Sequence, residues 1–447
     1  MSEVIVLGGG IVGRLTALHL QDAGVDVTLV DDATPGSASG AAGAMLGVHS
    51  EVGSADDAAR LAVDLEERGA ARAAWTQLAV RLDLELTEGL FVLANTFGYD
   101  DRRELDAIRT AAGPDRAKTV DPRDVPGLTP RREARAFDAL WLPGDATLDA
   151  EAALSAVDAA LGPVRRLHDT AVRLDLSGPG VRVELASGAD ASADRIVLAT
   201  GTATTALLEA SELAELGVPT VLGGRGVALT VAHGPVLPHA VRTPNRAFAC
   251  GLHAVPRATS TYLGATNRLS TRPARTTRPT LGEIDTVLSG ATTELHTGFR
   301  DAELLSAVAG HRPFVADHLP LVGPAADDRL VLATATYRNG WLLAPRVAAL
   351  VTDEIRSPGA LADHPFATQR PLVAPARITD LAMPGAADQL VAEGVDAVER
   401  FVTGAVAGLL GAADRDRLVR KLERLLATAP VDEVVPLLVE AVVRHRS

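Results

Sequence analysis

Three glycines and an aspartate near the start of the chain have the spacing of a nucleotide-binding loop. Gly8, Gly10 and Gly13 follow a run of β-branched residues, and Asp31 ends the next apolar run. In such a loop the first glycine allows a tight turn, the second lets the backbone approach a pyrophosphate, and the third lets a helix lie close to a sheet. N–H groups at the start of that helix favour phosphate, and Asp31 can accept hydrogen bonds from ribose hydroxyls, which disfavours a 2′-phosphate. The pattern predicts a βαβ unit that binds FAD or NAD.

Small residues dominate the next stretch, 36–51, which contains four glycines and many alanines and serines. Such residues let backbone pass against a flat ligand and donate N–H groups to it. A flexible linker is the alternative. The apolar pair Met45 and Leu46 argues against a linker, since a solvated linker is polar.

Hydrophobic periodicity places the elements that must position these residues. Helices are expected at 55–82 and 101–113, and a third is expected from an Asp149 cap through Leu161. A loop is expected at 121–130 and a turn at 141–145, where Pro143 and Gly144 are adjacent. Strands are expected at 84–93, 171–176, 181–185 and 195–201.

Composition limits the class of protein. The 447 residues are 47% hydrophobic and 22% charged, with a dispersed net charge of -14, so we expect two or three globular domains and no nucleic-acid partner. No apolar run reaches the ~18 residues of a membrane span, and Met1 leads directly into a strand. A single cysteine, Cys250, agrees with a reducing compartment. We therefore expect a cytoplasmic protein without membrane anchorage, and no spacing indicates a metal site.

Nine segments, spread over residues 1 to about 357, resemble the glycine oxidase and D-amino acid oxidase family of FAD enzymes. The chain is most similar to the glycine oxidase branch associated with thiamine biosynthesis. The matching segments are 4–31, 39–51, 141–149, 197–201, 253–257, 263–266, 310–313, 319–323 and 337–345.

The resemblance implies an α/β fold with a Rossmann-like FAD-binding domain and an inserted antiparallel-sheet substrate domain. The expected FAD-binding domain comprises 1–82, 145–222 and 300–372, and the expected substrate domain comprises 83–144 and 223–299. A C-terminal helical bundle is expected at 376–447, because apolar residues there recur at helical spacing. This bundle is interpreted as a means of homo-oligomerisation or partner docking, with a lid over the active site as the alternative.

The resemblance also implies a set of residues around non-covalently bound FAD. Val172 matches a position whose backbone meets the adenine, and the turn at Asn339 and Gly340 would place a helix N-terminus beside the flavin ring. The implied cofactor-binding residues are Gly8, Gly10, Ile11, Val12, Gly13, Asp31, Asp32, Ser39, Ala42, Gly43, Met45, Leu46, Val172, Thr200, Gly201, Arg338, Asn339, Gly340, Trp341 and Leu342.

Two arginines match active-site positions of that family. Arg312 matches the residue that binds the substrate carboxylate, for which a planar fork of donors is suited, and Arg338 matches a second active-site arginine. The alternative for Arg312 is a structural ion pair with a carboxylate such as Asp317. His253 and Asn267 replace a tyrosine and a methionine of the glycine oxidases, so we expect a more polar pocket and a substrate that carries its own polar group.

The activity implied is oxidation of an amino acid or an N-substituted glycine by hydride transfer to flavin N5. The resulting imine would hydrolyse to an oxo acid and an amine, and O2 would be reduced to H2O2. Two alternatives stay open. One is an amine dehydrogenase or a sarcosine-type oxidase of a specialised pathway, and the other is a non-catalytic flavoprotein that binds a partner through its C-terminal bundle.

Overall fold

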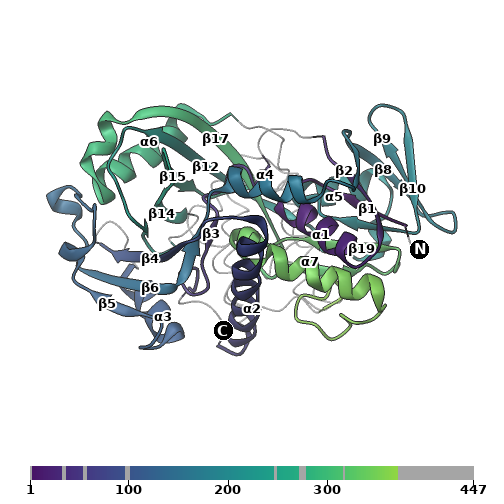
Figure 1. The fold of residues 1–447 in the computed structure, drawn as a ribbon, viewed down its shortest axis with the longest axis horizontal. Coiled ribbons are helices and arrows are strands. Elements are labelled where there is room, and N and C mark those ends of the chain that lie inside the picture. Colours follow the sequence, from purple (N-terminus) through teal and green to yellow (C-terminus); the bar gives the residue numbers. More distant parts are fainter. Residues whose placement is uncertain are drawn as a thin grey trace, which may run out of the picture.

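The computed structural model describes residues 3–32, 37–53, 58–95, 101–245, 249–270, 278–315 and 318–370. Most of its strands belong to two large sheets, one at the right and one at the left of Figure 1. The long strand β17 (Glu303–Phe314) runs from the left-hand sheet toward the other. The helical bundle expected at 376–447 lies outside the described residues.

The right-hand sheet is the nucleotide-binding type of sheet that the N-terminal pattern predicts. Its order is β18-β19-β11-β1-β2-β7, with β1 parallel to both β2 and β11 and only β18 antiparallel to its neighbour. Side chains of β1 alternate between two cores, so both faces are buried, as parallel sheets require. The strands are β1 (Glu3–Leu7), β2 (Asp26–Val30), β7 (Arg165–Leu167), β11 (Arg195–Leu198), β18 (Leu321–Pro324) and β19 (Leu330–Thr334).

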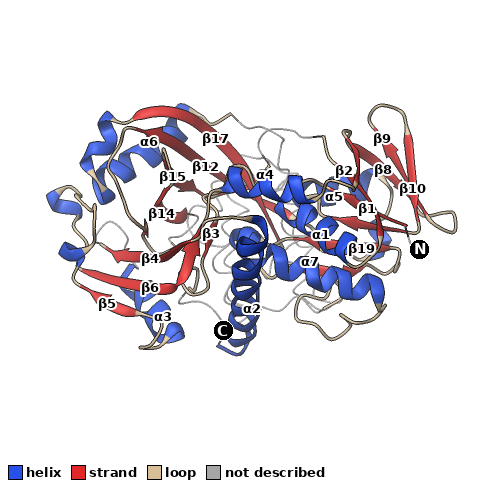
Figure 2. Ribbon diagram, in the orientation of Figure 1, coloured by secondary structure: helices blue, strands red, loops and turns tan. Residues whose placement is uncertain are grey.

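Helices cover one face of this sheet, and a small antiparallel sheet with one helix covers the other (Figure 2). On the first face Trp75 donates from Nε1 to the carbonyl of Trp341 at 2.7 Å, which ties two of the helices together. The helices of that face are α1 (Ile11–Asp22), α2 (Ala58–Leu82), α4 (Ala150–Ala160) and α7 (Gly340–Arg356). The other face carries α5 (Thr204–Ala210), β8 (Ala171–Asp175), β9 (Val181–Leu185) and β10 (Asp190–Ala193).

The left-hand sheet has ten strands in the order β16-β12-β15-β14-β13-β4-β6-β3, with β17 beside β12 and β5 beside β6. Every pair is antiparallel except β13 with β4. Helices α3 (Asp101–Ala112) and α6 (Leu281–Gly290) pack against it. The remaining strands are β3 (Met45–Leu46), β4 (Thr87–Ala94), β5 (Lys118–Val120), β6 (Asp138–Thr147), β12 (Leu222–Ala232), β13 (Ala240–Arg242), β14 (Ala249–Pro256), β15 (Thr261–Thr266) and β16 (Arg268–Ser270).

The predicted fold class, an α/β protein with a Rossmann-like sheet and a second, mainly antiparallel sheet, is confirmed. The Asp149 cap of α4 is confirmed as well, because its Oδ1 accepts from the N–H groups of Glu151 and Ala152 at 2.9 and 3.1 Å. The exact domain boundaries stay a prediction. β3 and the whole of β17 belong to the left-hand sheet, although the predicted boundaries assign them to the FAD-binding domain.

The turn predicted at 141–145 is wrong, because these residues lie inside β6. The pairing partners shift from Leu90 with Leu142 to Glu88 with Ala146, which leaves a bulge at Pro143 and Gly144. Proline and glycine are tolerated in a strand where the ladder is interrupted in this way. The adjacent pair therefore marks a bulge that bends a continuous strand.

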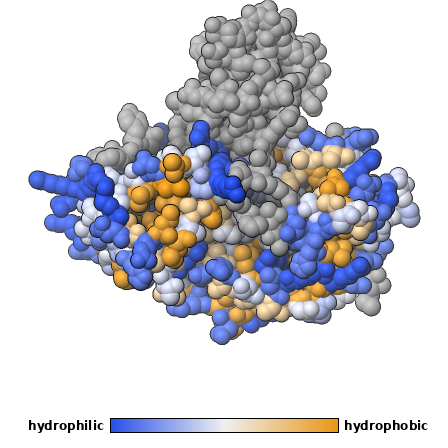
Figure 3. Space-filling view, turned by 90° about the horizontal axis from the view of Figure 1, so that it is seen from above, coloured by the Kyte–Doolittle hydropathy of each residue, from blue (hydrophilic) through white to orange (hydrophobic). Residues whose placement is uncertain are grey.

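The surface of the described part mixes hydrophilic residues with smaller apolar patches in the view from above (Figure 3). None of the helices in the described ranges has the length and apolar character needed to cross a membrane.

Candidate functional site

The glycine loop between β1 and α1 forms one end of the site. Gly8 has φ +106°, and a Cβ there would lie 2.5 Å from the carbonyl oxygen of Ala199, the residue that follows β11. A Cβ on Gly13 would lie 1.8 Å from the carbonyl oxygen of Gly8. Only glycine permits this approach of helix to loop, so the N-terminus of α1 is held at the edge of the sheet.

Two side chains fix the loop from outside. The Asp31 carboxylate, at the end of β2, accepts from the N–H of Gly9 at 3.0 Å. The Ser39 hydroxyl accepts from the N–H of Ile11 at 2.9 Å. Asp32 accepts from the hydroxyl of Thr170 at 2.7 Å and thereby joins the end of β2 to the start of β8.

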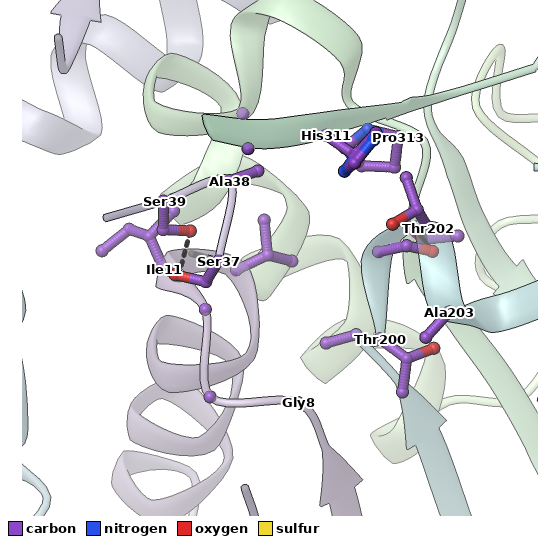
Figure 4. Close-up of a pocket in the computed structure, with 18 of the residues that line it drawn as sticks. Gly8, Ile11, Ser37, Ala38, Ser39, Thr200, Thr202, Ala203, His311 and Pro313 are labelled. Atoms are coloured by element: carbon purple, nitrogen blue, oxygen red, sulfur yellow. Dashed lines mark hydrogen bonds between the residues drawn. The ribbon is translucent and has the colours of Figure 1, made fainter. Parts of the chain in front are cut away.

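A cavity of about 650 Å³ begins at this loop and continues to the C-terminal part of β17. Figure 4 shows Gly8, Ile11 and Ser39 on one side and Thr200, Thr202 and Ala203 on the other, with His311 and Pro313 on the strand above. Most of the predicted site residues line it. They are Gly8, Gly10, Ile11, Val12, Asp31, Asp32, Ser39, Ala42, Val172, Thr200, Gly201, Arg312, Arg338, Gly340 and Trp341.

The other predicted residues are not among those that line the cavity. Met45 and Leu46 form β3 and pair with β6, and Leu342 is fully buried in α7. Gly43 faces the ring of Tyr262, whose Cε1 would be 2.9 Å from an added Cβ. The remaining ones are Gly13, His253, Asn267 and Asn339.

Arg312, on β17, closes the far end of the cavity above β12. Its Nη1 donates to the carbonyl of Thr266 at 3.1 Å and to Oδ1 of Asn267 at 3.2 Å. A Cβ on Gly226 would lie 2.3 Å from the same Nη1, so the guanidinium lies directly over that glycine. Within the described ranges Arg312 forms no ion pair, and Asp317, the predicted structural partner, lies outside them.

Tyr337 is a cavity-lining residue that the sequence reasoning did not single out. Its hydroxyl oxygen accepts from Nδ2 of Asn267 at 2.8 Å, and the guanidinium of Arg338 lies 4.9 Å from its ring centre. The ring also packs against Phe314 and His318. Asn267 therefore connects Arg312 and Tyr337 through one amide group.

His253 is buried next to this group, 3% exposed, and stacks on Tyr262 with the ring centres 5.6 Å apart. Burial, and then the guanidinium groups of Arg242 and Arg312, lower the pKa of His253 to about 3. The imidazole is therefore neutral at physiological pH.

A buried ion pair, also missed from the sequence, lies behind His253. Arg242 donates to the carboxylate of Glu51 and, from Nη2, to Oδ1 of Asn245 at 2.7 Å. Asn245 donates back to Oε2 of Glu51 at 3.0 Å. Burial would raise the pKa of Glu51, but the charges of Arg242 and Arg338 outweigh it and lower that pKa. Because these residues come from 51, 242–245 and 338, no local pattern could have shown the cluster.

The residues present fit a flavin dinucleotide. Two helix N-termini face the cavity, α1 at Gly10 to Val12 and α7 at Gly340, and each provides partial positive charge. The first suits a pyrophosphate and the second an electron-rich ring. Along the loop, Gly8 and Gly10 place no side chain in the space between.

Comparison with known proteins also indicates an FAD-binding protein. The profile of the family described as FAD dependent oxidoreductase (DAO) matches residues 3–354. The bifunctional protein ThiO/ThiG of Nostoc sp. (strain PCC 7120 / SAG 25.82 / UTEX 2576) is 28% identical over 362 residues, which are 79% of this chain and 52% of that protein. The chain thus spans about half the length of that relative.

Two glycine oxidases match over more of their length. The enzyme of Bacillus licheniformis is 26% identical over 365 residues, covering 79% of this chain and 92% of its own. The crystal structure of glycine oxidase from Geobacillus kaustophilus has a TM-score of 0.69 and 25% sequence identity, covering 83% of this chain and 99% of that one.

Proposed function

This chain belongs to the DAO family of FAD-dependent oxidoreductases, and from that premise we propose that it oxidises the amine of an amino acid or an N-substituted glycine. FAD is its cofactor, so NAD, which the glycine loop alone left open, is excluded. Arg312 carries the proposal. Its guanidinium lines the cavity, and within the described ranges its hydrogen-bond partners are neutral oxygens, so its charge is left for an anionic ligand.

In this proposal the chain's own residues bind the cofactor and the substrate and orient the substrate. FAD, when bound, would supply the hydride acceptor, with O2 as the proposed final oxidant and H2O2 as its product. Arg312 would hold the substrate carboxylate through a charge-assisted pair, which places the α-carbon and its nitrogen in a defined position. Within this proposal no side chain has to remove the α proton, and the buried His253, which is not among the lining residues, is neutral and adds no positive charge near Arg312. The imine product would hydrolyse to an oxo acid and an amine.

The test is a peroxide-release screen of the purified holoenzyme with glycine, sarcosine, D-amino acids and larger N-alkyl glycines. Arg312→Ala should keep the flavin, and kcat/KM for carboxylate substrates should fall by about two to four orders of magnitude, because an unpaired buried charge costs ~3–5 kcal/mol. Amines that lack a carboxylate are the control and should change far less. An equal fall for both classes would show that Arg312 is structural. Turnover without peroxide but with an artificial electron acceptor would favour a dehydrogenase.

We expect the FAD to be non-covalent, so acid precipitation should leave all the yellow colour in the supernatant. We also propose a cytoplasmic homo-oligomer assembled through residues 376–447, which rests on the helical periodicity and composition of the sequence.

A further inference from the structure

The orientation of the Asn267 amide decides what Tyr337 can do. An amide has one accepting and one donating end, which are hard to tell apart by shape alone. Arg312 has only donors, so the amide end that it contacts at 3.2 Å must be the oxygen. The NH2 end therefore faces Tyr337 at 2.8 Å, and the hydroxyl oxygen is the acceptor in that contact.

The hydroxyl proton of Tyr337 is then left to donate in another direction. Within the described ranges Asn267 is the hydrogen-bond partner of this hydroxyl, and Tyr337 lines the cavity. Arg312 lines it too, and both of its hydrogen bonds within those ranges use Nη1. The guanidinium of Arg312 thus lies at the oxygen end of the Asn267 amide, and the phenol of Tyr337 lies at its nitrogen end. Both the guanidinium and the phenol still have protons to donate.

Two glycines of β12 leave space for these side chains. A Cβ on Gly224 would lie 2.5 Å from Oδ1 of Asn267 and 3.3 Å from Cε2 of Tyr337, and a Cβ on Gly226 would meet Arg312. Gly224 and Gly226 are two apart on β12 and so face the same side of the strand. The three side chains therefore lie together over a strip of β12 that has no side chains of its own at these positions.

We propose that the Tyr337 hydroxyl is a second donor to the substrate carboxylate, beside Arg312, and that Asn267 is the positioning residue that orients both. This inference rests on the proposed function. A carboxylate has two oxygens at nearly the spacing of the amide's oxygen and nitrogen, so two donors that flank the amide can also flank a carboxylate. On this view Asn267 does not offer its polar atoms to the substrate, because both already have partners in the protein.

The test measures binding of an unreactive carboxylate to the holoenzyme. Acetate and its neutral analogue acetamide are titrated against wild type, Tyr337→Phe and Arg312→Ala, with the absorbance of the bound flavin and calorimetry as readouts. Phenylalanine keeps the ring that packs on Phe314 and under Arg338, and the flavin spectrum reports whether the variant is folded. The Kd of acetate should rise about ten- to a hundred-fold in Tyr337→Phe, the range for a hydrogen bond to a charged group, with acetamide changed less than about threefold.

The outcomes separate the two proposals. An acetate Kd in Tyr337→Phe within about threefold of wild type, with Arg312→Ala still impaired, would overturn this inference and leave the proposed function standing. Wild type that does not prefer acetate to acetamide, or Arg312→Ala without effect, would overturn both.

The role of Asn267 is tested separately with Asn267→Asp. A carboxylate in this place accepts from Arg312 and also from the Tyr337 hydroxyl, which turns that proton away from the cavity. In the Asn267→Asp background, Tyr337→Phe should therefore change the Kd of acetate by less than about threefold, a non-additive result for coupled residues. The same tenfold or larger loss as in the wild-type background would show that Asn267 does not orient the hydroxyl.

Discussion

The folded protein disfavours protonation of the His253 imidazole. Its pKa is about 3 in the folded state, compared with an ordinary value of 6.5, chiefly because burial disfavours the charged form and because Arg242 and Arg312 repel it. Below pH 6.5 the unfolded chain binds a proton that the folded chain does not. The free energy of unfolding is therefore lowered as the pH falls from 6.5 toward 3, and above 6.5 this loss is absent.

We expect wild type to lose stability more steeply on acidification than His253→Phe, which keeps a ring against Tyr262 but cannot titrate. The difference should approach about 1.4 kcal/mol per pH unit, or about 2 kcal/mol between pH 6.5 and 5. Denaturant unfolding at several pH values measures it. His233→Gln, a change at an exposed histidine, is the matched control and should follow wild type. Parallel curves for wild type and His253→Phe would contradict the prediction.

Strand β12 has a glycine at position 226, and the missing side chain leaves space for the Arg312 guanidinium. Gly226→Ala would put a Cβ 2.3 Å from Nη1 of Arg312, and the flexible guanidinium would move away. We expect kcat/KM for carboxylate substrates to fall about ten- to a hundred-fold, because small misplacements are costly in a positioned site. The free energy of unfolding should change by less than about 1 kcal/mol, since the displaced group is the end of a long side chain.

Gly282→Ala in α6 is the control for Gly226→Ala, because an added Cβ there has open space around it. It should leave activity unchanged and gain up to about 1 kcal/mol of stability. If Gly226→Ala loses no activity, Arg312 does not need its place above β12.

Two glycines at the junction of β1 and α1 should affect different properties, Gly10 the binding of the cofactor and Gly13 the stability of the fold. Gly10→Val should fold but be colourless, because the Cβ has only Ser39 Oγ nearby, at 3.1 Å, and would occupy the space of the pyrophosphate. Gly13→Ala should instead destabilise the fold, by ~1–3 kcal/mol or more, since its Cβ would meet the backbone oxygen of Gly8 at 1.8 Å. Flavin absorbance after gel filtration and unfolding curves distinguish the two. A yellow Gly10→Val would contradict the assignment of this loop.

At the scale of the whole molecule, the cavity lies where the two sheets meet. Its wall runs from the ends of β1, β2 and β11 in one sheet to β12 and β17 in the other. Among the residues that the structure describes, those that line the cavity fall between Leu7 and Trp341. Arg370 anchors the end of the described chain, because its guanidinium donates to the carbonyls of Leu319 and Pro320 at 3.0 and 2.7 Å.

Deletion of residues 376–447 should therefore leave FAD binding and kcat intact. The anchor at Arg370 is kept, and so is every lining residue within the described ranges. Light scattering should show a smaller assembly or aggregation if this segment joins subunits. A truncated protein of unchanged size with an altered KM would favour the lid, and a colourless one would contradict the prediction.

The sequence by itself determined the features that depend on a few neighbouring residues. The Asp149 cap acts within one turn of chain, and the glycine loop and the acid that ends β2 belong to one continuous βαβ unit, so their spacing carries their geometry. The resemblance to an FAD family, which pointed to Arg312, needed only segments of the sequence. Even locally, the adjacent Pro143 and Gly144 were ambiguous, because a turn and a bulge use the same residues, and only strand pairing with β4 distinguishes them.

Only the tertiary structure decided which residues share the far end of the cavity. Arg312, Asn267, Tyr337 and Gly226 come from two strands, the short segment after β15 and a 3-10 helix, and their contact depends on the register of β12 with β17 and β15. A shift of one residue would turn every side chain of a strand to the opposite face. That register is set by long-range packing, and so the partners of the Asn267 amide, and with them the proton of Tyr337, could not be derived from sequence spacing.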